Sequence, residues 1–306
     1  MKLAFLISAH TDAQHLLRLV NNLPSDSDKY IHIDLKTDIN AFSVVAAQNN
    51  VHIINERYNV MWGSFLQVNY QKALMKAALS SGVNYDYLIT LSGLDYPLWS
   101  NEKILRFFEK NKGREFIQGV CVKEQGKDTK IYREYRFLNN HCWEYGTLKS
   151  KFRVAIRKIV YALGFRKPLT VKCDGICYDL FKGSDWWAIT GNLAKYFMDF
   201  YDTHPAFVRY FKNSFSPNET IWQTIAFHSE YADKCILSKT DKIDELTPLT
   251  YIELGDDIKV LKFFTEDDFD TLIKSDKMFC RKVTTDKSNK LMDMIDKYRQ
   301  SYPIIS

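Results

Sequence analysis

The feature that most constrains the fold is the alternation of apolar runs with helical patterns over the first hundred residues. Leucines and a valine at helical spacing between residues 16 and 23, and a long helical pattern over 65–79, separate short runs that are typical of sheet strands. These runs are Leu3–Ser8, Tyr30–Asp34, Val51–Ile54 and Tyr87–Leu91. Strands that alternate with helices pair mostly in parallel. The sequence therefore predicts an α/β fold with a Rossmann-like, mostly parallel central sheet flanked by helices.

The carboxyl ends of the predicted strands carry polar residues, and phosphates and nucleotides bind at such ends. These residues are His10, Asp34, Lys36 and the turn Ser92–Asp95. The chain contains neither G-x-G-x-x-G nor G-x-x-x-x-G-K-[ST], so a Rossmann dinucleotide site and a P-loop lose their main sequence support. A nucleotide site of another kind remains compatible with this edge.

Composition and charge narrow the class of protein. With 46% hydrophobic and 26% charged residues, the chain is an ordinary globular protein. A net charge of +5 suits a phosphate-bearing ligand or an anionic membrane surface but is too small to indicate nucleic acid. Cys173 and Cys177 are close in sequence, but no second pair has zinc-ligand spacing. We expect buried or free thiols in a reducing compartment.

The rest of the chain shows no internal repeat or linker, which predicts one compact domain with a C-terminal extension. The N-terminus lacks the h-region and cleavage site of a signal peptide, and no later run approaches membrane-spanning length. We therefore expect a cytoplasmic protein, with peripheral membrane contact as a second interpretation.

A basic amphipathic helix is predicted around residues 150–165. One face of it carries apolar residues, and its basic residues fall largely elsewhere. The apolar residues are Phe152, Ile156, Ile159, Val160 and Leu163, and the basic ones Lys151, Arg157 and Lys158. Two interpretations stand: the helix docks on an anionic membrane, or its apolar face packs on the core of the protein.

The motif Ser216-Pro217-Asn218-Glu219 has the pattern of a helix start. Serine is a capping residue, proline suits the first helical position, and a glutamate three residues after the cap completes a capping box. Glu219 can therefore be a capping carboxylate or a carboxylate at the mouth of an active site. In the first helical turn, the helix dipole would favour its ionised form by roughly 0.3–1 kcal/mol.

Seven short segments follow one another in the order found in a single enzyme family. They are Ala4–His10, Tyr30–Lys36, Val60–Ser64, Tyr87–Leu98, Gly183–Thr190, Ser216–Thr220 and Met278–Val283. Through them the chain resembles the core-2/I-branching β-1,6-N-acetylglucosaminyltransferases of glycosyltransferase family 14, which include the peptide O-xylosyltransferases. It resembles a compact, bacterial-type soluble member without their membrane anchor and stem.

The resemblance implies a GT-A fold, a nucleotide-sugar donor, inversion at the anomeric carbon and catalysis without a metal. The base of the family is the glutamate of an S-P-D-E-type motif, which corresponds to Glu219. Asn218 stands where aspartate is common. Inverting transfer needs such a base for the acceptor hydroxyl and positive charge for the leaving diphosphate.

The resemblance also implies two C-terminal cations for the diphosphate. One corresponds to Lys282 and the other to Lys259, where the branching enzymes have arginine; Lys262 and Arg281 are substitutes for the second. Lysine keeps the charge but loses the bidentate geometry of arginine.

Further site residues follow from their places in the same segments. His10, Asp34, Trp62, Gly63 and Asp95 are expected to bind the nucleotide or donor sugar, although capping and turn roles would also explain them. Asp185 and Trp186 are expected to contact the acceptor. If Trp186 and Trp187 alternate on a strand, one of the two must face the core.

These expectations combine into one prediction. Residues 1–245 form a GT-A catalytic domain, with a nucleotide-sugar half at 1–112 and an acceptor half at 113–245 that carries the Glu219 helix; residues 246–306 form an extension that supplies the basic residues. The enzyme transfers GlcNAc, or else xylose, from its UDP-sugar to a glycan hydroxyl, with no other cofactor and no nucleic acid partner. Two alternatives are a metal-dependent transferase that uses Asp95 with Asp34 or Asp38, and a non-catalytic glycan-binding protein on the same scaffold.

Overall fold

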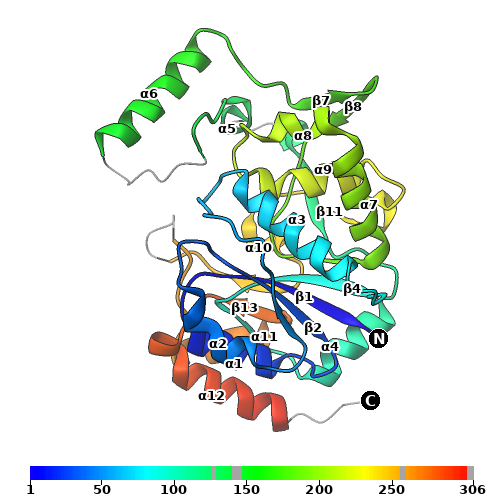
Figure 1. The fold of residues 1–306 in the computed structure, drawn as a ribbon, viewed down its shortest axis with the longest axis vertical. Coiled ribbons are helices and arrows are strands. Elements are labelled where there is room, and N and C mark those ends of the chain that lie inside the picture. Colours follow the sequence, from blue (N-terminus) through cyan, green and yellow to red (C-terminus); the bar gives the residue numbers. More distant parts are fainter. Residues whose placement is uncertain (126–128, 140–146, 256–259, 302–306) are drawn as a thin grey trace.

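A five-stranded sheet forms the centre of the protein, with the order β10-β4-β1-β2-β3. The computed structural model describes residues 1–125, 129–139, 147–255 and 260–301, without the side chains of residues 243 and 244. The strands are β1 (Leu3–Ala9), β2 (Asp28–Ile33), β3 (Val51–Ile53), β4 (Tyr87–Ser92) and β10 (Ala188–Thr190). The first four are parallel and β10 is antiparallel to β4. The predicted α/β fold with a mostly parallel sheet is confirmed (Figure 1).

The apolar runs arise because both faces of the sheet are buried. Along β1, Ala4 and Leu6 belong to one hydrophobic cluster, whereas Leu3, Phe5 and Ile7 belong to another on the opposite face. The first cluster includes α3 (Leu66–Leu79), and the second includes α1 (Ala13–Asn22), α2 (Ser43–Ala46) and α4 (Asn101–Lys110). Helices therefore flank the sheet on both sides (Figure 1).

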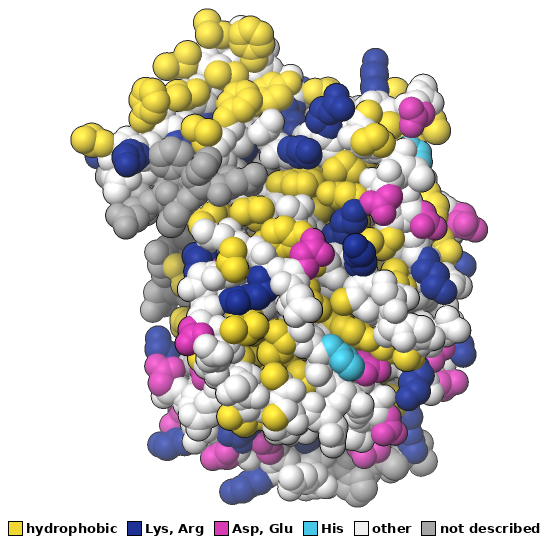
Figure 2. Space-filling view, in the orientation of Figure 1, with side chains coloured by type: hydrophobic (Ala, Val, Ile, Leu, Met, Phe, Trp, Pro, Cys, Tyr) yellow, Lys and Arg dark blue, Asp and Glu magenta, His cyan; other side chains and the backbone are white. Residues whose placement is uncertain are grey.

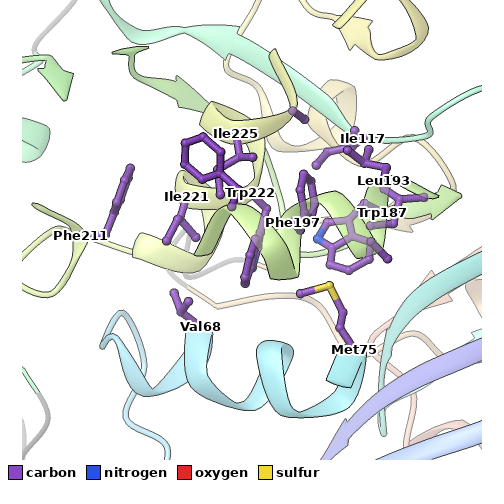
Figure 3. Packing of buried hydrophobic residues seen from close by; sticks show 14 of the residues in the cluster. Val68, Met75, Ile117, Trp187, Leu193, Phe197, Phe211, Ile221, Trp222 and Ile225 are labelled. Atoms are coloured by element: carbon purple, nitrogen blue, oxygen red, sulfur yellow. The ribbon is translucent and has the colours of Figure 1, made fainter. Parts of the chain in front are cut away.

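The segment from 113 to 240 extends the cluster around α3 with further helices and short strands. These are β6 (Gln118–Cys121), α5 (Lys130–Arg133), β7 (Thr170–Cys173), β8 (Ile176–Asp179), β9 (Phe181–Lys182), α7 (Gly191–Thr203), α8 (Pro205–Phe211), α9 (Ile221–Phe227) and β11 (Ile236–Leu237). Figure 3 shows Met75 of α3 facing Trp187 and Phe197, with Trp222 of α9 beside them. Trp222 also donates a hydrogen bond to Gln71 of α3, at 2.7 Å. This packing fixes α9, and the residues just before it, against α3.

The C-terminal segment is bonded to the turn after β4. β13 (Phe279–Arg281) pairs in parallel with β12 (Thr250–Ile252) and antiparallel with β5 (Asp95–Pro97). Nearby lie α10 (Ile243–Leu246), α11 (Phe269–Lys274) and α12 (Thr285–Ser301), and Arg18 of α1 forms ion pairs with Asp293 and Asp296 of α12. The segment predicted as an extension therefore delivers Arg281 to the carboxyl end of β4.

Helix α6 (Leu148–Ala162) lies at the edge of the molecule (Figure 1). Phe152, Ile159 and Leu163 are exposed, and Ile156 and Val160 are half-buried. The interpretation in which this apolar face packs on the core is therefore wrong. Within the described ranges, no helix is long and apolar enough to cross a membrane.

Candidate active site

Residues from three strand ends meet at the carboxyl edge of the central sheet. His10 follows β1, Asp34 follows β2, and Arg281 and Lys282 lie at the end of β13. Burial lowers the pKa of His10; Asp34 opposes this effect, and the charges of Arg281, Lys282 and Lys36 add to it. His10 is therefore neutral at pH 7, in a positively charged environment. The structure brings together the strand-end residues that the sequence indicated.

The buried side chain of Asp95 connects several residues at this edge through hydrogen bonds. It is fully buried, and its carboxylate accepts hydrogen bonds from the backbone N–H of Ser92 at 2.8 Å, from Trp186 Nε1 at 3.0 Å and from Arg281 Nη1 at 3.1 Å. Burial raises the pKa of Asp95, and the Arg281 charge and the N–H donors oppose that rise. The Arg281 guanidinium lies 5.1 Å from the centre of the Trp186 ring and also donates to Ser92 Oγ. Asp95 therefore positions Arg281 and Trp186.

Asp34 serves a similar positioning purpose for the loop after β3. Its carboxylate accepts hydrogen bonds from the backbone N–H groups of Lys36 at 2.9 Å and Val60 at 3.2 Å. The Asp34 side chain is buried, and the Lys36 ammonium lies 3.6 Å from it. These contacts are those of an aspartate that caps a loop and lies beside the positive charge of Lys36.

Two lysines supply positive charge without a neutralising partner. The ammonium of Lys282 lies 4.8 Å, and that of Lys287 4.3 Å, from the centre of the Phe263 ring. Burial lowers the pKa of Lys282, and the charges of Arg281 and Lys287 lower it further. Neither lysine forms an ion pair with any residue that the structure describes. Lys287, in the first turn of α12, was missed by the sequence interpretation because only the docking of α12 brings it here.

The other predicted diphosphate ligands differ from Lys282. Lys259 lies outside the described residues. Lys262, the substitute for it, forms an ion pair with Asp268 at 2.6 Å and with Glu253 at 3.4 Å, so its charge is already neutralised. Arg281 forms an ion pair with Asp95, and its positive charge still acts on the neighbouring Lys282.

The segment that carries Glu219 differs from the expected helix start. Pro217–Glu219 forms a short 3₁₀-helix, and α9 begins only at Ile221. Ser216 has a left-handed backbone, φ +37°, and its side chain makes no capping bond. The predicted capping box is therefore wrong. A non-glycine residue in this conformation is strained, and such residues cluster at functional sites.

The protonation of Glu219 also differs from the expectation. Its side chain is half-buried, and burial together with the nearby charge of Asp185 raises its pKa to about 8, against the opposing charge of Lys182. The prediction that a helix dipole keeps this carboxylate ionised is wrong, because burial outweighs a dipole effect of roughly 0.3–1 kcal/mol. No side-chain hydrogen bond to Glu219 occurs within the described ranges. Once ionised, the carboxylate is therefore free to accept a proton from a ligand.

Asp185 explains why residue 218 is an asparagine here. Asn218 Nδ2 lies 2.6 and 2.7 Å from the two carboxylate oxygens of Asp185, and Gln71 Nε2 donates to the same group at 3.0 Å. An aspartate at 218 would set two carboxylates against each other. Burial raises the pKa of Asp185, but its three N–H contacts favour the ionised form, so of this pair Glu219 holds the proton.

Two consecutive residues, Asp185 and Trp186, connect the segment that carries Glu219 with the basic strand ends. Asp185 contacts the Glu219 segment through Asn218, and Trp186 contacts Asp95 and Arg281. Trp187, only 1% exposed, packs in the core as the alternation of the two tryptophans required. Trp186 therefore belongs to the side of the site that carries the cations.

The loop of Trp62 and Gly63 lies beside the Glu219 segment. Gly63 has φ +69°, and a Cβ added there would lie 3.7 Å from Ser216 Oγ. The Trp62 ring is 78% exposed, and its centre is 5.8 Å from that of Phe215. The structure thus places this loop at the rim of the Glu219 segment. A cavity of about 470 Å³ lies elsewhere, between β7 and α8.

Known proteins are similar to this one over most of the chain. Residues 3–251 match the family model described as Core-2/I-Branching enzyme. The chain is 23% identical over 244 residues to xylosyltransferase oxt of Drosophila melanogaster, which covers 76% of this chain and 25% of that protein. It is 26% identical over 243 residues to human xylosyltransferase 2, covering 75% and 25% respectively. The chain thus spans about a quarter of the length of these relatives.

Two solved structures show lower similarity. TarS of S. aureus has a TM-score of 0.33 and 12% identity, covering 64% of this chain and 30% of TarS. Mouse xyloside xylosyltransferase 1 has a TM-score of 0.34 and 8% identity, covering 79% and 86%. The fold assignment rests on the order and direction of the strands.

Proposed function

Because the chain belongs to the core-2/I-branching enzyme family, we propose that it is a GT-A type glycosyltransferase that acts with inversion and without a metal ion. The donor is a UDP-sugar, UDP-GlcNAc first and UDP-xylose second, and the acceptor is a carbohydrate hydroxyl that becomes β-linked. The observation that carries the proposal is the half-buried Glu219 carboxylate, with its pKa raised to about 8, in a segment that Asn218, Asp185 and Trp186 connect to the cations at the strand ends.

Glu219 acts as the general base. A base works best when its pKa lies near the operating pH, because it must be ionised before the reaction and must bind a proton during it. The raised pKa of Glu219 meets both needs at neutral to mildly alkaline pH. As the acceptor oxygen bonds to the anomeric carbon, its proton passes to Glu219 and the bond from that carbon to the diphosphate oxygen breaks on the opposite face.

The basic strand ends stabilise the leaving group. Lys282 and Lys287 carry unneutralised charge beside Phe263, and Arg281 is held in place by Asp95. Fixed positive charges stabilise the negative charge that develops on a departing diphosphate. His10, which is neutral, and Asp34 line the same edge and complete the nucleotide side of the site.

Trp186 and Trp62 delimit the space for the two sugars. Trp186 is held by Asp95 on the donor side, whereas Trp62 is exposed at the rim of the Glu219 segment. Aromatic faces of this kind stack on sugar rings. Because Trp186 contacts Asp95 and Arg281, we assign the donor sugar to the Trp186 side and the acceptor to the Trp62 side, which reverses the roles expected from the sequence motifs. Asp185 positions Glu219 through Asn218.

The contacts of Asp95 support a mechanism without a metal. Its oxygens already accept bonds from Ser92, Trp186 and Arg281, which leaves the metal-dependent alternative without its main ligand. We place the enzyme in the cytoplasm, in the synthesis of a cell-surface polysaccharide or glycan.

The proposal is tested by incubating the purified chain with UDP-GlcNAc or UDP-xylose and measuring release of UDP in excess EDTA. We expect release that persists in EDTA. Release that vanishes in EDTA and returns with manganese would support the metal-dependent alternative. Binding of a glycan without turnover of either donor would favour the non-catalytic alternative.

A further inference from the structure

The orientation of α6 is unusual for a surface helix. Leu148, Phe152, Ile159 and the capping residue Leu163 are 84, 67, 57 and 69% exposed, and their spacing places them on one face of the helix. Ser150 is the only α6 residue that is buried. Figure 2 shows hydrophobic side chains gathered at the upper left, over α6. The face that normally packs on a core therefore points to solvent.

Charged residues attach the opposite face of α6 to the protein. Arg157 lies 3.1 Å from the buried carboxylate of Glu134, and Arg153 donates a hydrogen bond to Asn139 at 3.2 Å. Glu134 also binds Arg136, whose guanidinium lies 4.7 Å from the centre of the Phe215 ring. These ion pairs fix the helix with its apolar face outward, next to the Glu219 segment.

The charge around this face is of one sign. Residues 145–173 contain no aspartate or glutamate. Lys149 borders the apolar face on one side and Lys151 and Lys158 border it on the other, all three exposed. Basic residues flanking an exposed apolar stripe complement an anionic lipid surface. A second copy of the chain would oppose the same basic residues to each other without an acidic partner.

We propose that α6 docks the protein on an anionic membrane surface, with the apolar face of α6 in the lipid interface and Lys149, Lys151 and Lys158 at the headgroups. Trp62 contacts Phe215, whose ring also lies against Arg136, so the loop of Trp62 is connected to the contacts that hold α6. Together with the proposed function, docking of this kind suits an acceptor that is attached to a lipid.

Flotation of the full chain with vesicles tests the proposal. We expect binding to vesicles that contain phosphatidylglycerol and phosphatidylcholine, weak binding to pure phosphatidylcholine, and loss of binding at high salt. The double variant Phe152→Ser/Ile159→Ser should bind at least about ten-fold more weakly. Its matched control, Val44→Ser/Leu237→Ser, removes two other exposed apolar side chains and should bind as the native protein does.

A second set of variants changes the charge alone. Lys149→Gln/Lys151→Gln/Lys158→Gln should lose about five-fold per lysine, or about a hundred-fold in total. The control Lys76→Gln/Lys110→Gln/Lys297→Gln should lose far less, although it removes the same net charge. Thermal unfolding checks that each variant is folded.

Three results would overturn the proposal: no binding of the native protein to anionic vesicles, equal binding of both α6 variants and their controls, or a native dimer that the Phe152→Ser/Ile159→Ser variant converts to a monomer. The vesicle assay contains no nucleotide sugar, so failure of docking is separate from failure of the proposed reaction.

Discussion

Asp95 and Glu219 are both carboxylates of the proposed active site, but their surroundings differ. Asp95 accepts hydrogen bonds from three N–H groups, one of them on a guanidinium. Glu219 accepts none from the part of the chain that the structure describes, and its pKa is raised to about 8. A carboxylate that accepts several hydrogen bonds holds its neighbours in place, whereas a half-buried carboxylate without such donors is available to bind a proton. Altering each in turn tests this division of roles.

The largest effect is expected from Glu219→Gln. Removal of a general base costs on the order of 10²–10⁴ in rate, and glutamine has nearly the same shape and avoids a buried charge. We expect a loss of that size in kcat, measured by UDP release. The temperature of thermal unfolding should be no lower than that of the native protein. Glu109→Gln, on an exposed surface, is the control. Unchanged turnover would remove Glu219 from the mechanism.

Asp95→Asn should act on stability instead. It leaves the Arg281 guanidinium largely buried without its charge partner, and breaking such a pair costs about 3–5 kcal/mol. Urea unfolding measures this loss. The control Asp293→Asn breaks a more exposed pair with Arg18 and should cost within about 1 kcal/mol. Equal losses in the two variants would contradict the positioning role of Asp95.

The two lysines sharpen the comparison on the donor side. Lys282→Ala should lower kcat/KM by roughly 10²-fold, as loss of one group that stabilises a developing negative charge does. Lys287→Ala should lower it by about five-fold, since an exposed charge acts through water at ~1 kcal/mol. Lys110→Ala, far from the site in an exposed position, should be neutral. A smaller effect of Lys282→Ala than of Lys287→Ala would reverse this assignment.

Much of the sheet could be predicted because its strands are buried on both faces. The run from Leu3 to Ser8 is apolar at successive positions for that reason, and the residues after such strands must meet at one edge. The sequence therefore indicated His10, Asp34 and Asp95 as neighbours of the C-terminal cations. Membership of the family, shown by the match over residues 3–251, agrees with the resemblance read from seven motifs.

The parts of the site that could not be predicted depend on contacts between segments that are distant in the sequence. Asn218 binds Asp185, 33 residues away, and burial together with the charge of Asp185 raises the pKa of Glu219. Lys287 reaches the site only through the docking of α12. The direction of α6 follows from the Arg157–Glu134 pair, because hydrophobic periodicity defines a face of a helix but not what that face contacts. The domain boundary at 245/246 stays a prediction.

The pH dependence of donor turnover tests the central claim most directly. Glu219 must lose its proton to act as a base, and its pKa in the folded protein is about 8. We therefore expect kcat/KM for the UDP-sugar, measured in EDTA, to rise about ten-fold per pH unit below that pKa and to level off above about pH 8. An activity that levels off near pH 4.5, the usual range of a glutamate, would contradict the account.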